Sequence, residues 1–219
     1  MSTALIAGAS GLTGSALMEL LLESNAYDRV KVLVRRPLEI EHPSLEQILY
    51  DYEHPDNSRI QADHVYCCLG TTMKKAVTRQ AFFRVDHDYP LQVARAAYQN
   101  GAGKFALVSA VGANPRSMFF YNRVKGKLEE DLKEIPFTAL YIFRPSILLG
   151  CRDEFRLAEA LGKGIMKSFS FLLPGNMKPI HARQVAACMF DRMWSEEKGV
   201  HIIQSKEMQN FPLKYRERD

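Results

Sequence analysis

Short apolar runs alternate with amphipathic stretches along nearly the whole chain of 219 residues. The apolar runs predict buried strands at residues 3–8, 30–35, 45–51, 63–70, 104–112, 137–146, 178–181 and 199–205. Stretches with helical periodicity or a polar face predict helices at residues 12–24, 85–101, 117–135, 152–161 and 182–194.

Strands that alternate with helices over short connections are typical of a doubly wound α/β fold with a parallel sheet. Parallel strands that helices cover on both faces are expected to be apolar almost throughout, as these runs are. No linker, repeat or low-complexity segment interrupts the alternation. We therefore predict one domain over residues 1–219, with a mostly parallel sheet of six to seven strands.

The segment GASGLTG joins the first predicted strand to the first predicted helix and contains Gly8, Gly11 and Gly14. Glycine permits a tight turn at the first position, close approach to a pyrophosphate at the second, and helix–strand packing at the third. The helix start, with Leu12 and Thr13, offers free N–H groups and a partial positive charge to phosphates. This spacing is the variant found in short-chain dehydrogenases, so the loop predicts a dinucleotide; the alternative is a glycine-rich turn without a ligand.

The second predicted strand ends in VLVRRP, which places Arg35 and Arg36 where an adenosine ribose is expected. A carboxylate there would bind the ribose 2′-hydroxyl and repel a 2′-phosphate. Guanidinium groups instead match a phosphate in charge and in the geometry of their planar donors. Ser10, within the glycine loop, offers a hydroxyl to the same phosphate. NADP(H) is therefore favoured over NAD(H), with a pair of solvated loop arginines as the alternative.

Two further segments are predicted to line the cofactor. Asp51 follows the third strand, where a carboxylate can accept a hydrogen bond from the adenine amino group. A simple turn residue fits that position equally well. Leu69, Gly70 and Thr71 end the fourth predicted strand, so we expect them beside the cofactor's ribose and diphosphate.

The pattern Tyr-x-x-x-Lys occurs twice, and its context separates the two occurrences. Tyr27 and Lys31 span the end of a predicted helix and the start of a strand, at the N-terminal edge of the sheet. Residues four apart face each other only on a helix, and ligands of such sheets bind at the carboxyl edge. This pair is therefore excluded. Tyr121 and Lys125 share one predicted helix, which follows the strand that ends at Ser109.

Proton transfer gives these three residues distinct roles. A carbonyl that receives a hydride also needs a proton, which Tyr121 can supply. A free phenol has a pKa near 10, and the Lys125 ammonium together with an oxidised nicotinamide is expected to lower it. Lys125 can also bind the nicotinamide ribose, and Ser109 can donate a hydrogen bond to the substrate oxygen. The alternative is a helix-surface tyrosine and lysine with a capping serine.

Seven segments resemble, in order, the atypical short-chain dehydrogenase/reductases of the Tat-interacting-protein type: GASGLTG, VLVRRP, CCLGTT, VDHDYP, LVSAVGA, YNRVKG and RPSILLG. The likeness covers the chain as far as residue 205. The resemblance implies a Rossmann fold that binds NADPH, with Ser109, Tyr121 and Lys125 as the catalytic triad. It also implies that the nicotinamide lies beside Arg144, Pro145 and Ser146.

One departure from the family pattern concerns the fourth member of a proton relay. Many relatives carry an asparagine where this chain has Asp86 or a neighbour, so the resemblance does not imply a complete relay. Relatives in this branch also include regulatory proteins whose substrate is not settled.

Residues 147–180 are expected to form a small substrate-side subregion. Apolar side chains in it and ahead of Tyr121 suggest an apolar, aromatic substrate pocket, although each alone is also an ordinary core residue. They are Met118, Phe119, Phe155, Phe169, Phe171 and Leu172. The C-terminal portion of the chain is too short for the sizeable substrate domain of sugar-nucleotide epimerases, so a small carbonyl or quinone is favoured over a nucleotide sugar.

The sequence thus favours an NADPH-dependent reductase with Tyr121 as the acid. Two alternatives stay open. One is an NADPH-binding regulator with little turnover that recruits a protein partner, and the other is an epimerase-like enzyme with a tightly held cofactor. A homodimer also stays open.

Charge and cysteine usage narrow the class of protein. The net charge of +4 is spread along the chain rather than clustered with aromatic residues, which speaks against a nucleic-acid binder. The four cysteines, Cys67, Cys68, Cys151 and Cys188, have no metal-ligand spacing and are expected to be reduced thiols. Cys67 and Cys68 should point to opposite faces of the sheet.

Location is predicted from two further features. The N-terminal segment has no basic leader, and no apolar run reaches the roughly 18 residues that span a bilayer. We therefore expect a cytoplasmic protein without a membrane segment.

Overall fold

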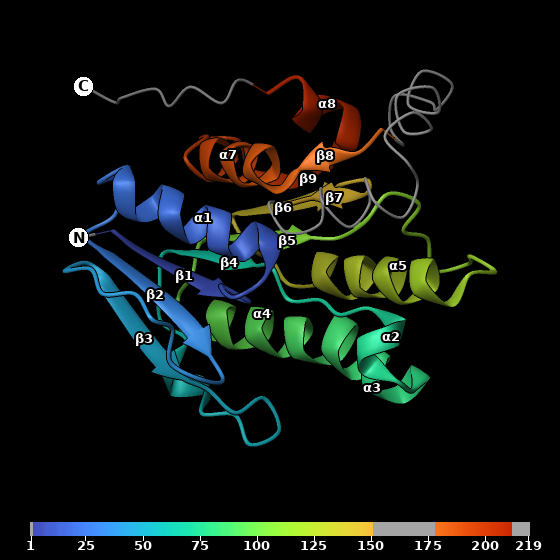
Figure 1. Ribbon diagram of the computed structural model, residues 1–219, viewed down its shortest axis with the longest axis horizontal. Coiled ribbons are helices and arrows are strands. Elements are labelled where there is room, and N and C mark those ends of the chain that lie inside the picture. The colour runs from blue at the N-terminus through green and yellow to red at the C-terminus, as the bar shows by residue number, and fades with distance from the viewer. Residues whose placement is uncertain (1, 151–177, 212–219) are drawn as a thin grey trace.

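The computed structural model describes residues 2–150 and 178–211, and its centre is one seven-stranded sheet (Figure 1). The strand order is β3-β2-β1-β4-β5-β6-β9, and every neighbouring pair is parallel. The strands are β1 (Thr3–Ala7), β2 (Arg29–Val34), β3 (Leu45–Leu49), β4 (His64–Cys67), β5 (Lys104–Val108), β6 (Ala139–Arg144) and β9 (Gly199–Gln204). This confirms the predicted α/β fold with a parallel sheet in Rossmann-like order.

The strand order reverses at β1, which lies between β2 and β4. Ala7 pairs with both Leu33 of β2 and Cys67 of β4, so the three strands end nearly level. Ligands of doubly wound sheets bind in the crevice beyond the carboxyl ends of the strands, at such a reversal. The topology therefore directs attention to the loops that follow β1, β2 and β4.

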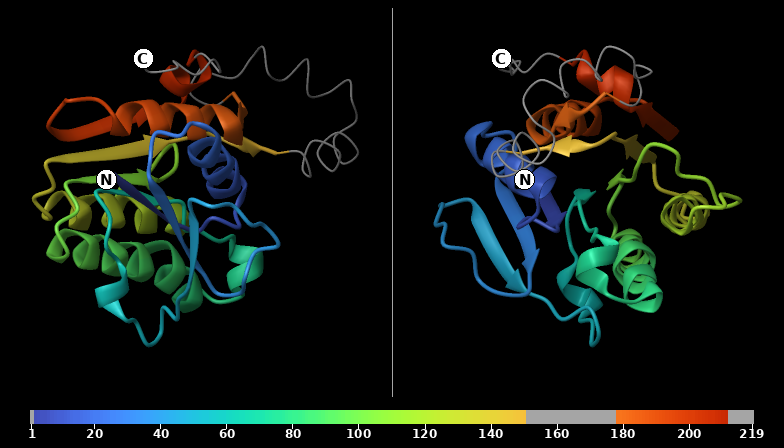
Figure 2. Two further views of the ribbon diagram at one scale, coloured as in Figure 1. Left: turned by 90° about the vertical axis from the view of Figure 1, so that its left-hand side faces the viewer. Right: turned by 45° about the vertical axis from the view of Figure 1, so that its right-hand side comes forward.

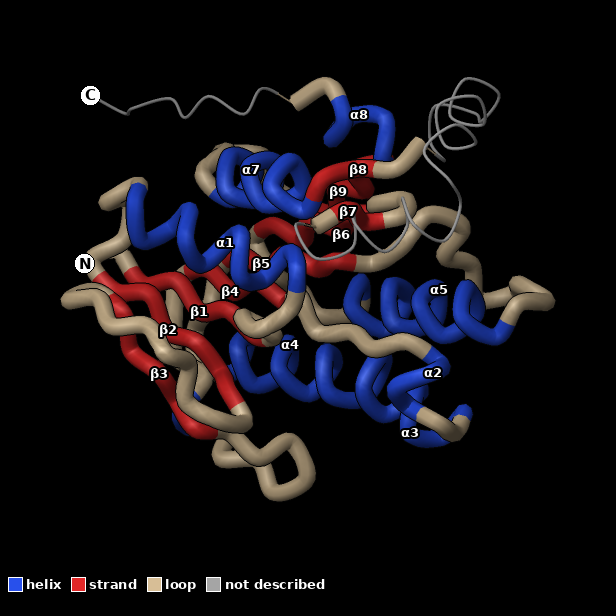
Figure 3. The backbone as a smooth tube through the Cα atoms, in the orientation of Figure 1, coloured by secondary structure: helices blue, strands red, loops and turns tan. Residues whose placement is uncertain are grey.

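Helices cover both faces of the sheet (Figure 2). The helices α1 (Leu12–Glu23) and α7 (Ala182–Met193) pack on one face, with α8 (Ser205–Gln209) next to α7. On the other face lie α4 (Tyr89–Gln99) and α5 (Phe120–Lys133), which Figure 3 shows below β5 and β6. A separate two-stranded sheet pairs β7 (Leu148–Leu149) with β8 (Ile180–His181).

Alternation along the strands divides the core into two apolar clusters. In β1, Ala4 and Ile6 belong to the α1/α7 cluster, whereas Leu5 and Ala7 belong to the cluster under α4 and α5. Successive side chains of a strand point to opposite faces, so each apolar strand supplies both cores. Cys67 packs in the second cluster and Cys68 against the first, as predicted.

The segment between β4 and α4 differs from the prediction. It forms two short helices, α2 (Met73–Ala76) and α3 (Arg79–Phe83), followed by a π-helical turn, Arg84–Asp88, that runs directly into α4. The sequence analysis placed the helix start only at residue 85 and missed α2, α3 and α8. Their polar, weakly periodic sequences lack the apolar stripe that marks longer helices.

Two other differences concern helix ends and the substrate side. The helix that carries Tyr121 begins at Phe120 rather than at residue 117. The predicted helix 152–161, Cys151 and most of the subregion 147–180 lie outside the described residues, so the structure does not test them.

Candidate active site

The glycine loop after β1 is shaped by close backbone contacts. Gly8 has a φ of +90°, and a Cβ there would lie 2.7 Å from the carbonyl oxygen of Cys68 at the end of β4. A Cβ on Gly14 would lie 2.1 Å from the carbonyl oxygen of Gly8. The Gly11 N–H donates to that same oxygen at 3.0 Å. A side chain at Gly8 or Gly14 would therefore push α1 away from the sheet.

The N-terminus of α1 has the donors that a diphosphate requires. Gly11 is the N-cap residue and supplies no side chain to the first N–H groups of the helix. Ser10, Gly11 and Leu12 are exposed, whereas Thr13 is buried. Within the described part of the chain, the buried Thr13 Oγ1 has no hydrogen-bond partner. Uncapped N–H groups, an orphaned hydroxyl and a partial positive charge fit the phosphates of a dinucleotide.

The loops after β2 and β3 carry the residues that were predicted to contact the adenosine. Arg35 and Arg36 directly follow β2, and both are exposed. Asp51 is also exposed, and its carboxylate accepts from the backbone N–H of Glu53 at 2.9 Å and contacts His54 Nδ1 at 3.1 Å. These hydrogen bonds, the backbone one first, lower the pKa of Asp51. Asp51 thus makes hydrogen bonds within its own loop, and its contact with an adenine stays a prediction.

Tyr121 and Lys125 lie in the first two turns of α5, and Lys125 is almost completely buried, with 3% of its surface exposed. Its Nζ lies 2.9 Å from Oδ1 of Asp86, a residue of the π-helical turn. The other oxygen of Asp86 accepts from the Thr71 N–H at 2.8 Å. A Cβ on Gly70 would lie 3.7 Å from Lys125 Nζ, which brings the segment after β4 against the pair. Asp86 and Lys125 therefore join β4, the π-helical turn and α5 at one point.

The ion pair changes the proton chemistry expected for Tyr121. Burial raises the pKa of Tyr121, Lys125 lowers it and Asp86 raises it, with a net increase. Burial lowers the pKa of Lys125, but Asp86 and Tyr121 raise it, again with a net increase. Lys125 thus acts on Tyr121 in the expected direction, but burial and Asp86 together outweigh it. The net increase was not predictable from the sequence, because its largest cause is the burial of Tyr121 and a further cause is Asp86.

Ser109 immediately follows β5 and is buried in a different cluster. Its hydroxyl donates to Glu129 Oε1 of α5 at 2.5 Å. The same carboxylate accepts from Arg144, with Nε to Oε1 at 3.0 Å and Nη2 to Oε2 at 2.5 Å. No hydrogen bond joins Ser109 to Tyr121 in the described part of the chain. The structure thus brings Tyr121 and Lys125 together and ties Ser109 to Glu129, a residue that the sequence analysis did not single out.

The segment Arg144, Pro145 and Ser146 runs next to the loop that follows β5. The carbonyl of Pro145 accepts from the Val111 N–H at 2.9 Å. The Ser146 N–H donates to Ser205 Oγ at 3.2 Å, and its hydroxyl donates to the Lys178 carbonyl. This segment therefore closes the carboxyl edge of the sheet beside β6 through backbone and hydroxyl contacts.

Apolar side chains stand exposed around the start of α5. Met118 is 95% exposed, and Phe119 is exposed as well. Val77, at the end of α2, is 82% exposed and has a φ of +66°, which is strained for a β-branched residue. The other residues expected to line a substrate pocket, Phe155, Phe169, Phe171 and Leu172, lie outside the described residues.

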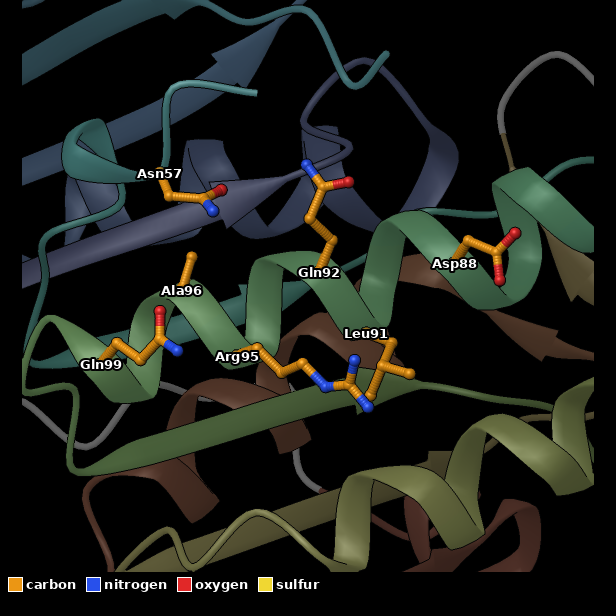
Figure 4. Close-up of a pocket in the computed structure, with 7 residues that line it drawn as sticks. All are labelled: Asn57, Asp88, Leu91, Gln92, Arg95, Ala96 and Gln99. Atoms are coloured by element: carbon orange, nitrogen blue, oxygen red, sulfur yellow. The ribbon is translucent and has the colours of Figure 1, made fainter. Parts of the chain in front are cut away.

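Elsewhere, an open pocket runs along α4 (Figure 4). Gln92 and Arg95 extend to different sides of that helix. The pocket is lined by Asn57, Asp88, Leu91, Gln92, Arg95, Ala96 and Gln99. It includes none of the residues predicted for catalysis or for the cofactor, so it is separate from the candidate site.

Sequence comparison identifies the family of this chain. A family model described as NAD(P)H-binding matches residues 8–141, from the first glycine of the loop to β6. The chain belongs to this NAD(P)H-binding family. It is also 39% identical over 164 residues to protein HTATIP2 of Rattus norvegicus, which covers 72% of this chain and 67% of the relative. The family of relatives expected from the sequence motifs is thereby confirmed.

Fungal members of the family extend the likeness and correct one prediction. The mitochondrial protein FMP52 of Eremothecium gossypii is 31% identical over 214 residues, covering 94% of this chain and 95% of the relative. Its counterparts in Candida albicans and Aspergillus fumigatus are also named mitochondrial. The cytoplasmic location expected from the sequence is therefore wrong, because composition does not distinguish the cytosol from the interior of an organelle.

Solved structures share the fold at low sequence identity. MoeE5 in complex with UDP-glucose and NAD superposes with a TM-score of 0.73 at 16% identity, covering 94% of this chain and 79% of that chain. A UDP-glucuronic acid 4-epimerase from Bacillus cereus in complex with NAD gives 0.68 at 16% identity, with coverages of 94% and 78%. These neighbours confirm the fold.

Two kinds of site are absent from residues 2–150 and 178–211. Those residues contain no group of three or more His, Cys, Asp or Glu side chains that could hold a metal ion. Their helices are all too short or too polar to cross a bilayer.

Proposed function

We propose that the chain is an NADPH-dependent oxidoreductase that reduces a small carbonyl or quinone, with Tyr121 as the proton donor. The observation that carries this proposal is the placement of Tyr121 and Lys125 on one face of α5, with Lys125 Nζ paired to Asp86 at 2.9 Å. The family supports the coarser part, an NAD(P)-binding oxidoreductase-like protein.

NADPH, when bound, supplies the hydride. Gly8, Gly11 and Gly14 would admit its diphosphate to the start of α1, where the Thr13 hydroxyl is a further donor. The cofactor contacts proposed from the sequence also include Ser10, Leu12, Asp51, Leu69, Gly70, Thr71, Arg144, Pro145 and Ser146. The preference for NADPH rests on Arg35 and Arg36, because two exposed guanidinium groups suit a 2′-phosphate dianion.

The protein's own part in the reaction is to deliver one proton. Tyr121 is 38% exposed, so a substrate can reach its hydroxyl, and its raised pKa keeps the phenol protonated at neutral pH. Tyr121 gives this proton to the carbonyl oxygen as the carbonyl carbon is reduced, and solvent then restores it. Lys125 stabilises the phenolate that forms. Ser109, through its hydroxyl, is the proposed donor to the substrate oxygen, for which it has to leave Glu129.

The substrate side supports an apolar reactant. Met118 and Phe119 expose apolar surface just before α5, and Val77 does so at the end of α2. Exposed apolar side chains of this kind mark interaction sites. A small apolar aldehyde, ketone or quinone fits such a rim better than a polar sugar nucleotide does.

A turnover panel tests this function. Oxidation of NADPH is measured with aldehydes, ketones and quinones, and NADPH binding is measured in parallel. Turnover of at least one apolar compound, lost in Tyr121→Phe, is expected. Tight NADPH binding with no oxidation across the panel would instead indicate a regulator. Interconversion of UDP-sugars without net oxidation of NADPH would indicate an epimerase-like enzyme.

A second measurement tests the cofactor. The double variant Arg35→Ala/Arg36→Ala should lower the affinity for NADPH about 10- to 100-fold and change that for NADH little, since charge-assisted hydrogen bonds contribute about 1.5–3 kcal/mol. The exposed Arg59→Ala, which lies on η1 (Asn57–Arg59), is the matched control and should leave both affinities as they are. An unchanged NADPH/NADH ratio in the double variant would remove the 2′-phosphate assignment.

A further inference from the structure

The π-helical turn holds a buried carboxylate that the proposed reaction does not otherwise use. Asp86 is 1% exposed, and both of its oxygens have positively polarised neighbours. Lys125 Nζ lies 2.9 Å from Oδ1, and the Thr71 N–H donates to Oδ2 at 2.8 Å. A buried carboxylate and a buried ammonium are both costly to remove from water, so such a pair persists only where each compensates the other.

We propose that Asp86 is a positioning residue: it fixes Lys125 beside Tyr121 and balances the lysine charge, so that Tyr121 is held ready to give a proton rather than to accept one. This inference rests on the proposed role of Tyr121 as the acid. It adds a buried carboxylate to the group formed by Tyr121 and Lys125.

Geometry gives this residue its influence over Tyr121. The ammonium of Lys125 alone would stabilise the phenolate and make Tyr121 a base near neutral pH. The Asp86 carboxylate cancels much of that field, because the two charges are in contact and both are shielded from solvent. Asp86 also acts directly, since a negative charge near a phenol favours the protonated form.

Within residues 2–150 and 178–211, few other titratable groups face this pair. Lys125 is faced by Asp86 from the π-helical turn, by Tyr121 from its own helix and by Cys67 from β4. Burial raises the pKa of Cys67 to about 11, so this thiol carries no charge at neutral pH. The balance of charge at Tyr121 therefore depends on Asp86 and Lys125.

The test is a titration of Tyr121 without cofactor or substrate. Phenolate absorbance is followed against pH for the parent and for Tyr121→Phe, and the difference between the two isolates the Tyr121 component. In Asp86→Asn this component should move to lower pH by on the order of one unit. Asp88→Asn is the matched control. It removes a carboxylate of the same turn, but that carboxylate contacts His87 rather than Lys125, so the Tyr121 component should stay in place.

Circular dichroism checks that Asp86→Asn folds. If it does not, a second variant that is expected to shift the Tyr121 titration in the opposite direction still tests the proposal. Lys125→Met leaves the Asp86 charge uncompensated and should move the Tyr121 component to higher pH. A component that stays in place in either folded variant, or that shifts equally in Asp88→Asn, overturns the proposal. Because neither NADPH nor a carbonyl is present, this result is independent of the turnover panel. A failed panel with the expected titration would reject the reductase and leave the role of Asp86 intact.

Discussion

Two stretches of this chain carry the same tyrosine–lysine spacing and lie in opposite surroundings. In the first, the Tyr27 hydroxyl is buried in the α1/α7 core, 2.6 Å from His64 Nδ1 and 2.8 Å from the Tyr66 hydroxyl. Lys31 belongs to β2 and donates to the Gln61 carbonyl at 3.0 Å. The tyrosine is thus held by internal hydrogen bonds, and the lysine contacts a loop on the surface.

In the second stretch the burial is reversed. Lys125 is buried and paired with a carboxylate, while Tyr121 is 38% exposed and packs at 5.6 Å from the ring of Phe82. A buried lysine is retained only where its charge is compensated, whereas a buried tyrosine needs only a hydrogen-bond partner. The Tyr-x-x-x-Lys spacing alone therefore does not indicate a proton-transfer pair. The chemistry of each stretch depends on which of its two side chains is buried.

The largest expected effect is on turnover, which should respond to substitution of Tyr121 but not of Tyr27. Tyr121→Phe should lower kcat by about 10²- to 10⁴-fold and leave NADPH binding intact, because general acid catalysis contributes by that factor. Tyr27→Phe should leave kcat unchanged and cost about 1 kcal/mol of stability, since it removes hydrogen bonds in the core. Steady-state kinetics and denaturant unfolding measure both. Equal kcat in Tyr121→Phe and the parent would mean that Tyr121, like Tyr27, has no catalytic role.

Substitutions of the two lysines should differ in their effect on the stability of the protein. Lys125→Met leaves Asp86 buried without its partner, so we expect a loss of about 3–5 kcal/mol in the free energy of unfolding. Lys31→Met removes one contact at the surface and should cost less than about 1 kcal/mol. Urea titrations of both variants provide the measurement. Similar losses would mean that the Asp86–Lys125 pair is not the buried pair described above.

A smaller effect concerns pH at the first stretch. Burial, followed by Lys104, lowers the pKa of His64 from 6.5 to about 4. The folded protein therefore keeps His64 neutral where the unfolded chain takes up a proton. Stability that is fully present above pH 6.5 should be lost as pH falls towards 4, by up to about 3 kcal/mol.

His64→Gln tests the origin of this acid sensitivity. Its stability should depend less on pH between 6.5 and 4 than that of the parent. Tyr121→Phe, which leaves the His64 cluster untouched, should retain the full dependence. An identical profile for His64→Gln and the parent would assign the acid sensitivity to other groups.

Much of the fold followed from local patterns. Apolar runs predicted all seven strands of the main sheet, since strands buried on both faces have few polar residues. The glycine loop was also predictable, because Gly8 and Gly14 have no room for a Cβ. The short helices α2 and α3 were not, because their form depends on capping by Thr72 and Thr78 rather than on a stripe.

The site was predictable only where its residues are neighbours in sequence. Tyr121 and Lys125 are one helical turn apart, so their shared face could be derived from spacing. The pairing of Lys125 with Asp86, and of Ser109 with Glu129, joins elements distant in sequence. A glutamate in the polar run Glu129–Glu130–Asp131 gives no local sign that it is buried against an arginine.

The number of residues in the π-helical turn affects the geometry of this site. A π-helical turn accommodates an extra residue within an otherwise α-helical rod. Deleting Arg84 would restore α-helical winding and change the angle between Phe82 and Asp86 around the helix axis. The aromatic support of Tyr121 would then face elsewhere, although every residue of the site was still present. A single-residue deletion far from the glycine loop could thus inactivate the site, and comparisons among relatives should count residues in this turn as carefully as they compare them.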